Sequence, residues 1–134
     1  MIRPVLACLA LTLPAAALEE SPPLSGPEFA ARVTGKTIYF EQHGFAYGAE
    51  TYKPDGRVIW RFSGEECRFG QWYPQGDAIC FVYEYAPTEP QCWHFFDQPD
   101  GLVGRALGAD PADDLVGRLE SPAPLICDRP YFGA

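Results

Sequence analysis

The sequence has few residues of the kinds that act as catalytic nucleophiles or bases. It holds four serines and two histidines: Ser21, Ser25, Ser63, Ser121, His43 and His94. Phe62-Ser63-Gly64 does not match the Gly-x-Ser-x-Gly pattern of hydrolases. Glu65 and Glu66 are neighbours, so a strand would turn their carboxylates to opposite faces, which does not suit paired acid and base catalysis. We identify no catalytic residues and predict a protein that is not an enzyme.

Paired metal ligands are also missing from the sequence. It has no Cys-x-x-Cys pair, and the closest combination is Cys92 with His94. These two side chains would share one face of a regular strand, which leaves a metal site geometrically open. Structural zinc sites, however, usually draw on paired cysteines. We therefore predict no metal and no cofactor.

Basic residues are outnumbered by acidic ones. Ten Lys and Arg against 18 Asp and Glu give a net charge of −8, and the basic residues form no stripe. This charge argues against nucleic acid as a partner, because phosphates would be repelled. Acidic surfaces often just keep a secreted protein in solution. A cationic partner is the alternative.

The apolar stretch near the N-terminus is too short to anchor the chain in a membrane. It covers residues 5–13, whereas a helix needs roughly 20 residues to span a bilayer. Arg3 before it and the alanines after it complete the pattern of a secretory signal peptide over residues 1–17. Leu6-Ala7-Cys8 resembles the end of a lipoprotein motif, which is the alternative. We predict a periplasmic or secreted protein with no transmembrane segment after cleavage.

The rest of the chain is expected to be one domain preceded by a leader. Residues 18–24 are polar and contain two prolines, and residues 25–134 suffice for one hydrophobic core. Ser25 and Glu28 have the spacing of a capping box, which predicts a short helix over residues 27–33. Gly35 would end that helix.

From Lys36 onward, short runs rich in Ile, Val, Tyr, Phe and Trp alternate with turn residues. Pro54-Asp55-Gly56 predicts a tight hairpin turn, and the same three residues at Pro99-Asp100-Gly101 predict a second one. Further reversals are expected at 63–64, 74–77 and 87–90. The expected strands are 36–41, 45–52, 57–62, 66–73, 78–85, 92–97, 102–107 and 115–119. The sequence therefore predicts a mainly β fold, an antiparallel meander of about eight strands curled into a small barrel with a short N-terminal helix.

The hairpin at Asp55 also predicts which side chains share a face. With Tyr52 opposite Arg57, Glu50 and Tyr52 fall on the outer face. The expected core face holds Phe45, Tyr47, Ala49, Thr51, Val58, Trp60 and Phe62. In the next hairpin both faces are apolar, with Trp72, Ile79, Phe81 and Tyr83 on one and Cys67, Phe69, Cys80 and Val82 on the other. Such a sheet needs cover on both faces, which the helix and a disulfide-tied tail would provide.

Four of the five cysteines follow the expected signal peptide: Cys67, Cys80, Cys92 and Cys127. An even number in an oxidising compartment predicts two disulfides. Three pairings are possible. We favour Cys80 with Cys92, on adjacent strands, and Cys67 with Cys127, which would fix the C-terminal tail.

Aromatic residues are concentrated in the predicted barrel wall. Sixteen of the 19 lie between Tyr39 and Phe96. Aromatic side chains at strand spacing usually form a core, and a ligand pocket is the alternative. Because a buried hydroxyl or indole N–H needs a partner, rings with a polar tip are the candidate ligand-binding residues. These are Tyr47, Trp60, Trp72 and Tyr83.

Two resemblances follow from these segments. The blocks at residues 34–40, 47–60, 67–72, 76–84 and 92–93 resemble a family of small exported bacterial proteins without an assigned function, and this likeness implies no activity. The short helix, Gly35 and the eight-strand meander are similar to lipocalin-like (calycin) barrels. That second resemblance implies binding of small apolar ligands.

Three functional hypotheses come from different classes, and the third is an enzyme, which would require His43 or His94 to cluster with carboxylates in a cleft. The first is a noncatalytic exported binding module that takes a small apolar ligand in its aromatic-lined barrel, which calls for a cavity of roughly 300 Å³ or more. The alternative is a periplasmic protein-binding or inhibitor module that acts through exposed rings such as Tyr39 and Tyr52. It calls for a contiguous apolar patch on the surface.

Overall fold

The computed structural model describes residues 1–2, 8–11 and 21–128. Most of the signal peptide predicted over residues 1–17 lies outside these residues, as do residues 18–20 of the leader and residues 129–134. Within the described parts of the chain, no helix is both long and apolar enough to cross a membrane.

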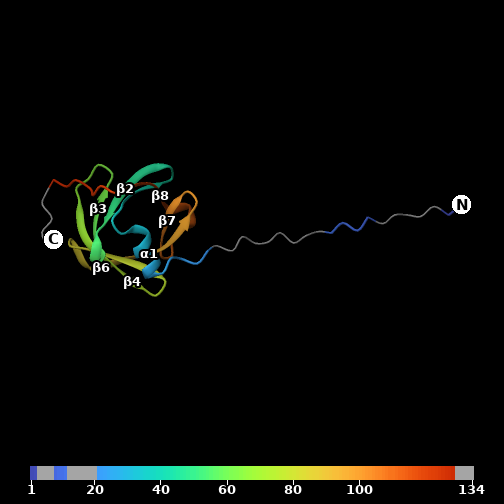
Figure 1. The fold of residues 1–134 in the computed structure, drawn as a ribbon, viewed down its shortest axis with the longest axis horizontal. Helices are drawn as coiled ribbons and strands as arrows, with labels where there is room; N and C mark the ends of the chain where they lie inside the picture. Colours follow the sequence, from blue (N-terminus) through green and yellow to red (C-terminus); the bar gives the residue numbers. More distant parts are fainter. Residues whose placement is uncertain (3–7, 12–20, 129–134) are drawn as a thin grey trace.

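Eight antiparallel strands form a closed barrel, in which each strand pairs with the next and β8 returns to pair with β1 (Figure 1). The strands are β1 (Thr37–Gln42), β2 (Phe45–Tyr52), β3 (Arg57–Phe62), β4 (Arg68–Gln75), β5 (Ala78–Tyr83), β6 (Ala86–Gln98), β7 (Gly101–Ala106) and β8 (Leu115–Ser121). The predicted fold class is confirmed. The architecture is compatible with a calycin-like fold.

Helix α1 (Gly26–Val33) packs into the barrel from one end. The Ser25 hydroxyl accepts from the Glu28 N–H at 3.2 Å, and the Glu28 carboxylate accepts from the Ser25 N–H at 2.9 Å, so the predicted capping box is confirmed. Phe29 and Val33 are fully buried in the same cluster as Leu102 on β7. The helix therefore fills one end of the interior with apolar side chains.

The reversal predicted at residues 87–90 is wrong. The chain turns earlier, at Glu84 and Tyr85, and Pro87-Thr88-Glu89-Pro90 belongs to β6. Tyr83 pairs with Ala86, whereas Phe81 pairs with Gln91, so the prolines lie in an irregular stretch that does not match β5 residue for residue. Prolines lack the N–H that a regular ladder requires, and a bulged stretch accommodates them.

The register predicted for the β2–β3 hairpin is wrong by one residue. Tyr52 pairs with Val58 instead of Arg57. The Lys53 N–H donates to the Arg57 carbonyl at 2.8 Å, so the loop has three residues instead of four, with Asp55 at φ +66°. Aspartate tolerates this left-handed conformation. A one-residue slip exchanges the two faces of a strand, so β2 presents Glu50 and Tyr52 to the interior.

The expected core face was correct for β3 and partly wrong for β2. Val58, Trp60 and Phe62 pack in the barrel core, but Ala49 and Thr51 lie on the outside and Phe45 is exposed. Tyr47 still packs against the rings of Trp60 and Phe62, because it occupies a bulge: Phe40 pairs with Gly48 and Glu41 pairs with Ala46. A bulge re-aims a side chain that regular alternation would place on the other face.

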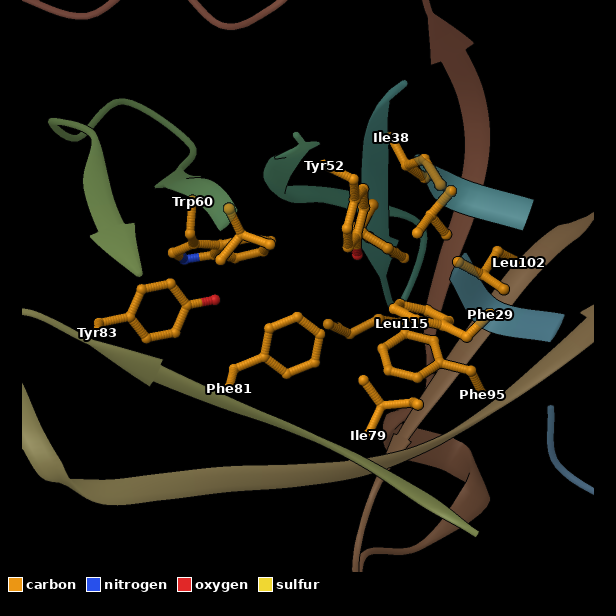
Figure 2. Close-up of a cluster of buried hydrophobic side chains, with 13 residues drawn as sticks. Phe29, Ile38, Tyr52, Trp60, Ile79, Phe81, Tyr83, Phe95, Leu102 and Leu115 are labelled. Atoms are coloured by element: carbon orange, nitrogen blue, oxygen red, sulfur yellow. The ribbon is translucent and has the colours of Figure 1, made fainter. Parts of the chain in front are cut away.

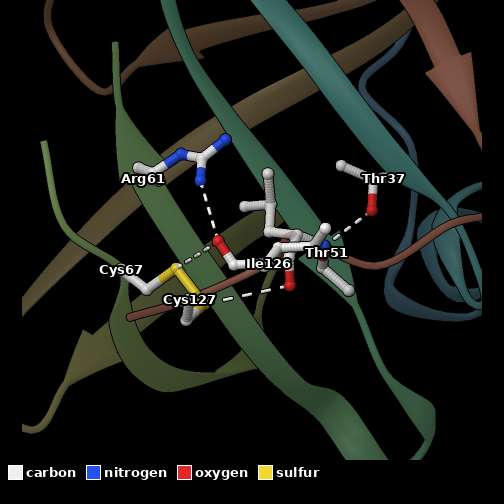
Figure 3. The surroundings of a disulfide bond; sticks show 7 residues. Thr37, Thr51, Arg61, Cys67, Ile126 and Cys127 are labelled. Atoms are coloured by element: carbon white, nitrogen blue, oxygen red, sulfur yellow. Dashed lines mark hydrogen bonds between the residues drawn. A yellow bond between two sulfur atoms is a disulfide. The ribbon is translucent and has the colours of Figure 1, made fainter. Parts of the chain in front are cut away.

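A second, smaller cluster lies outside the barrel beneath the C-terminal tail. Its buried members are Ala49, Ile59, Cys67, Phe69 and Leu125. The disulfide Cys67–Cys127 fixes the tail over them (Figure 3). Thr51 also holds the tail in place, because its hydroxyl accepts a hydrogen bond from the Leu125 N–H at 2.9 Å. The tail thus covers the outer apolar face, as the sequence predicted.

The second disulfide joins Cys80 on β5 to Cys92 on β6, which are directly paired residues of neighbouring strands. Both disulfides have the pairing that we favoured from the sequence. Together with the barrel, they fit a protein that folds in an oxidising compartment.

Candidate ligand pocket

The barrel interior is solid at the α1 end and hollow at the other. Figure 2 shows Trp60 and Tyr83 at one end of the core and Phe29 and Leu102 at the other. The hollow is a pocket of about 60 Å³. Ten of its 13 lining residues are aromatic: Phe40, Tyr47, Tyr52, Trp60, Phe62, Phe81, Tyr83, Tyr85, Trp93 and Phe95. Glu50, Gln91 and Leu115 complete the lining. Because Tyr85 and Gln91 are exposed, the pocket reaches solvent beside them.

Two glycines determine where the pocket rings stand. A Cβ atom built on Gly48 would lie 2.5 Å from the Trp60 ring. One built on Gly70 would lie 2.7 Å from the Tyr83 ring. These spacings leave no room for any other residue, so each glycine provides the space against which a pocket ring packs.

Glu50 is the acidic residue of the pocket and is 2% exposed. The Tyr83 hydroxyl lies 3.1 Å from each oxygen of its carboxyl group and donates to it. Burial raises the pKa of Glu50 to about 8, although the hydrogen bond from Tyr83 acts in the opposite direction. The carboxyl group is therefore mostly protonated at neutral pH.

The pKa values of the two tyrosines beside Glu50, Tyr52 and Tyr83, are also raised. Burial raises the pKa of Tyr52 and of Tyr83 well above the ordinary value, and the charge of the Glu50 carboxylate raises both further. Both phenols are therefore protonated at neutral pH. Among Glu50, Tyr52 and Tyr83, Glu50 is the group whose pKa burial brings close to neutral pH.

The mouth of the pocket carries charge of both signs. The Arg68 guanidinium lies 5.0 Å from the centre of the Phe62 ring and 4.8 Å from that of Tyr85. Its Nη2 atom is 3.4 Å from the Glu65 carboxylate. Glu65, Glu66 and Glu84 form an acidic rim, because they line one surface hollow together with Arg68 and Tyr85. The local charge at the mouth is negative.

Three of the four predicted ligand-binding residues come together in the pocket. Tyr47, Trp60 and Tyr83 line it, whereas Trp72 lies at the other end, edge-on to Phe29 at 5.1 Å between ring centres. Sequence reasoning missed Glu50, because the wrong hairpin register placed it outside. The length of the turn would have predicted its position, since a three-residue loop at 54–56 places the Glu50 side chain in the barrel interior.

The histidines do not join this pocket. His43 is paired with Asp113 at 3.1 Å, and His94 lies 3.1 Å from Asp77. Both contacts are on the surface of the barrel. In the part of the chain that the structure describes, no group of three or more His, Cys, Asp and Glu side chains is arranged to hold a metal ion.

A second hollow of about 280 Å³ lies on the outer surface of β1, β2 and β8. Tyr39 and Leu119, which pair across β1 and β8, both line it and are both exposed. Arg61 and Arg118 also border it. Glu41 lines it too and is paired with Arg118 at 3.0 Å, so the hollow combines exposed apolar surface with charges of both signs.

Comparison with known proteins adds no further assignment: no family model matches the chain, and no match was found among curated proteins or solved structures. The two resemblances drawn from the sequence stay predictions.

Proposed function

We propose that this protein is a noncatalytic exported binding module whose aromatic pocket takes a small ligand. The observation that carries the proposal is the arrangement of the pocket, in which ten aromatic rings enclose one buried carboxyl group beside an open mouth. Ligand sites typically combine an apolar lining with a few polar groups that orient the ligand. Glu50 and the hydroxyl of Tyr83 would be those groups.

The size of the pocket limits what it can enclose. Its volume of about 60 Å³ is well below the roughly 300 Å³ expected for a whole apolar molecule of the lipocalin-ligand kind. A water molecule takes about 30 Å³ of liquid. The pocket therefore suits a very small molecule, or the end group of a longer one whose remainder leaves through the mouth beside Tyr85.

Export is supported by two independent features. The chain has two disulfides, and disulfides are typical of proteins in oxidising compartments. The sequence of residues 1–17 has the layout of a signal peptide. We therefore propose a periplasmic or secreted location.

The three tryptophans provide a direct test of the proposed pocket. Trp60 and Trp93 line it, whereas Trp72 lies outside it and serves as an internal control. We expect a panel of small alcohols, amines, carboxylates and phenols to contain molecules that shift the indole N–H signals of Trp60 and Trp93 in nuclear magnetic resonance spectra, with Trp72 unmoved. A panel that leaves all three signals in place, or moves only Trp72, would overturn the proposal.

A protein-binding or inhibitor module is the second candidate, and the outer hollow favours it. Tyr39 and Leu119 provide exposed apolar surface there. Tyr52, which we had also expected on the surface, is 2% exposed and cannot contribute. This candidate predicts that Leu119→Asp abolishes capture of a specific partner while the pocket signals of Trp60 stay unchanged. Equal capture by the wild type and the variant would exclude this surface.

A further inference from the structure

Burying a carboxyl group in a pocket lined by aromatic rings costs desolvation free energy, which suggests that Glu50 is there to bind a ligand. Taking an ionised carboxylate out of water requires a compensating charge or several hydrogen bonds. Glu50 has one donor, the Tyr83 hydroxyl. Among the described residues that line the pocket, none is a lysine, an arginine or a histidine. The counter-ion that an ionised Glu50 needs is therefore one that the pocket itself does not provide.

The surrounding rings favour a cation in that place. Aromatic faces attract positive charge, and cages of several rings with a carboxylate recognise ammonium groups. Glu50 pairs with Trp60 across β2 and β3 and accepts from the Tyr83 hydroxyl, and Tyr52 and Phe81 line the same pocket. An anion would be repelled by the ionised carboxylate of Glu50. A neutral apolar group would add no partner for Glu50 beyond the Tyr83 hydroxyl.

From these contacts we propose that the pocket binds the positively charged head group of a small aliphatic amine, with Glu50 as its counter-ion. The inference rests on the proposed function, since it names the class of ligand for the same pocket. A volume of about 60 Å³ holds an ammonium group and one or two carbon atoms. The rest of an alkyl chain would pass through the mouth beside Tyr85 and Gln91.

The charge outside the pocket agrees with a cationic ligand. The acidic rim of Glu65, Glu66 and Glu84 borders the hollow beside the mouth, and Arg68 is the one basic residue among those that line it. Arg68 is already held between Phe62 and Tyr85 and paired with Glu65. The whole chain has a net charge of −8. Such a field raises the local concentration of cations and speeds their association.

Binding of a cation at Glu50 should displace its proton. The carboxyl group is mostly protonated at neutral pH, and an ammonium group forms an ion pair with the ionised form. The other titratable groups that face the pocket are the phenols of Tyr47 and Tyr52 on β2, Tyr83 on β5 and Tyr85 in the turn after it. Burial raises the pKa of Tyr52 and of Tyr83 further from neutral pH, and β1, β3, β6 and β8 contribute no titratable side chain to the described lining.

The test compares n-butylammonium with n-butanol and butyrate, which have the same alkyl chain and differ in charge. In calorimetric titrations of the whole protein, we expect n-butylammonium to bind at least tenfold more tightly than the other two. At pH 7 it should release close to one proton, measured from buffers of different ionisation enthalpy. Its affinity should rise about tenfold per pH unit between pH 6 and 8, because Glu50 must lose its proton.

Two variants sharpen the assignment. Glu50→Gln keeps the shape and removes the charge, so n-butylammonium should fall to the affinity of n-butanol and release no proton. Glu89→Gln, at an exposed position on β6, should bind like the wild type. If Glu50→Gln does not fold, the comparison of the three probes on the wild type and the proton count still decide the matter.

The outcomes separate the two proposals. If n-butanol binds as tightly as n-butylammonium and shifts Trp60 and Trp93, the pocket is a binding site but the cationic ligand class is wrong. If n-butylammonium binds without releasing a proton, Glu50 is not its counter-ion and the inference is overturned. If none of the three probes, nor any member of the wider panel, moves the pocket signals, both proposals are wrong.

Discussion

At the scale of single residues, Glu50 is the group whose surroundings depart most from what its chemistry prefers. A carboxyl group in a ring-lined interior avoids the cost of desolvation by keeping its proton. Its single hydrogen bond to Tyr83 is compatible with either charge state. The folded protein therefore holds a proton on Glu50 that the unfolded chain releases.

This difference makes stability depend on pH in a defined direction. The pKa of Glu50 is about 8 in the folded protein and near 4.3 in an unfolded chain. Between these values the native state binds the extra proton, so the free energy of unfolding falls by about 1.4 kcal/mol per pH unit as the pH rises. The contribution is complete below about pH 4 and is lost as the pH passes through about 8.

Glu50→Gln removes this dependence, because an amide does not titrate. We expect the variant to gain stability relative to the wild type as the pH rises from 5 to 9, measured by urea unfolding at three pH values. Glu89→Gln, an exposed substitution on β6, is the control and should track the wild type. A constant difference between Glu50→Gln and the wild type over this range would contradict the assignment.

Tyr83→Phe should raise the pKa of Glu50 above its wild-type value. The phenol hydroxyl is the donor that favours the ionised carboxylate, and phenylalanine keeps the ring but removes the donor. The measurement is a carbon NMR titration of the Glu50 carboxyl group. Tyr73→Phe, at an exposed ring on β4 outside the pocket, should leave the titration unchanged. A pKa that falls in Tyr83→Phe would exclude the proposed donor role.

At the scale of elements, local signals predicted the strands well and the faces of one strand poorly. The eight strands follow from turn residues and alternation, which act within a few residues. The face of β2 depends on whether the loop before β3 has three or four residues, and proline, aspartate and glycine are suited to both. The bulge at Tyr47 has no local sequence signal, because it arises from pairing across strands. Pro87 and Pro90 do mark an interruption, but they suit a turn and an irregular strand equally, and only the pairing with β5 decides between them.

The candidate site was predicted to the same extent. Polar-tipped rings at strand spacing identified Tyr47, Trp60 and Tyr83 as lining residues. Trp72 has the same chemistry and faces the same interior, but it lies at the end that α1 fills. Position along the barrel axis depends on the tilt and stagger of the strands, which alternation within one strand does not encode.

Helix α1 depends on its cap for its start. Ser25→Ala removes the acceptor for the Glu28 N–H, and such a loss typically costs about 1 kcal/mol. We expect a fall of this size in the free energy of unfolding, measured with urea. Ser21→Ala, at an exposed serine before the helix, is the matched control and should have no effect. Equal effects of the two substitutions would show that the cap does not stabilise the helix.

At the scale of the whole molecule, the two disulfides hold the barrel in different ways. Cys80–Cys92 joins neighbouring strands 12 residues apart in sequence, where β-pairing already restrains the chain. Cys67–Cys127 spans 60 residues and fixes the tail, whose Leu125 packs over Ile59 and Phe69 in the outer cluster. Removing it would both free a long loop in the unfolded chain and expose that cluster.

The lengths of the two closed loops predict which disulfide stabilises the protein more. The chain-entropy relation assigns about 3 kcal/mol to a loop of the shorter length and about 4 kcal/mol to the longer one. We therefore expect the double substitution Cys67→Ser with Cys127→Ser to lower the free energy of unfolding by more than Cys80→Ser with Cys92→Ser, since loss of the tail's cover over Ile59 and Phe69 adds to the entropic term. Urea unfolding of both variants measures the difference. A larger loss for the pair on β5 and β6 would mean that strand pairing there depends on the disulfide, and that the tail contributes little to the stability of the barrel.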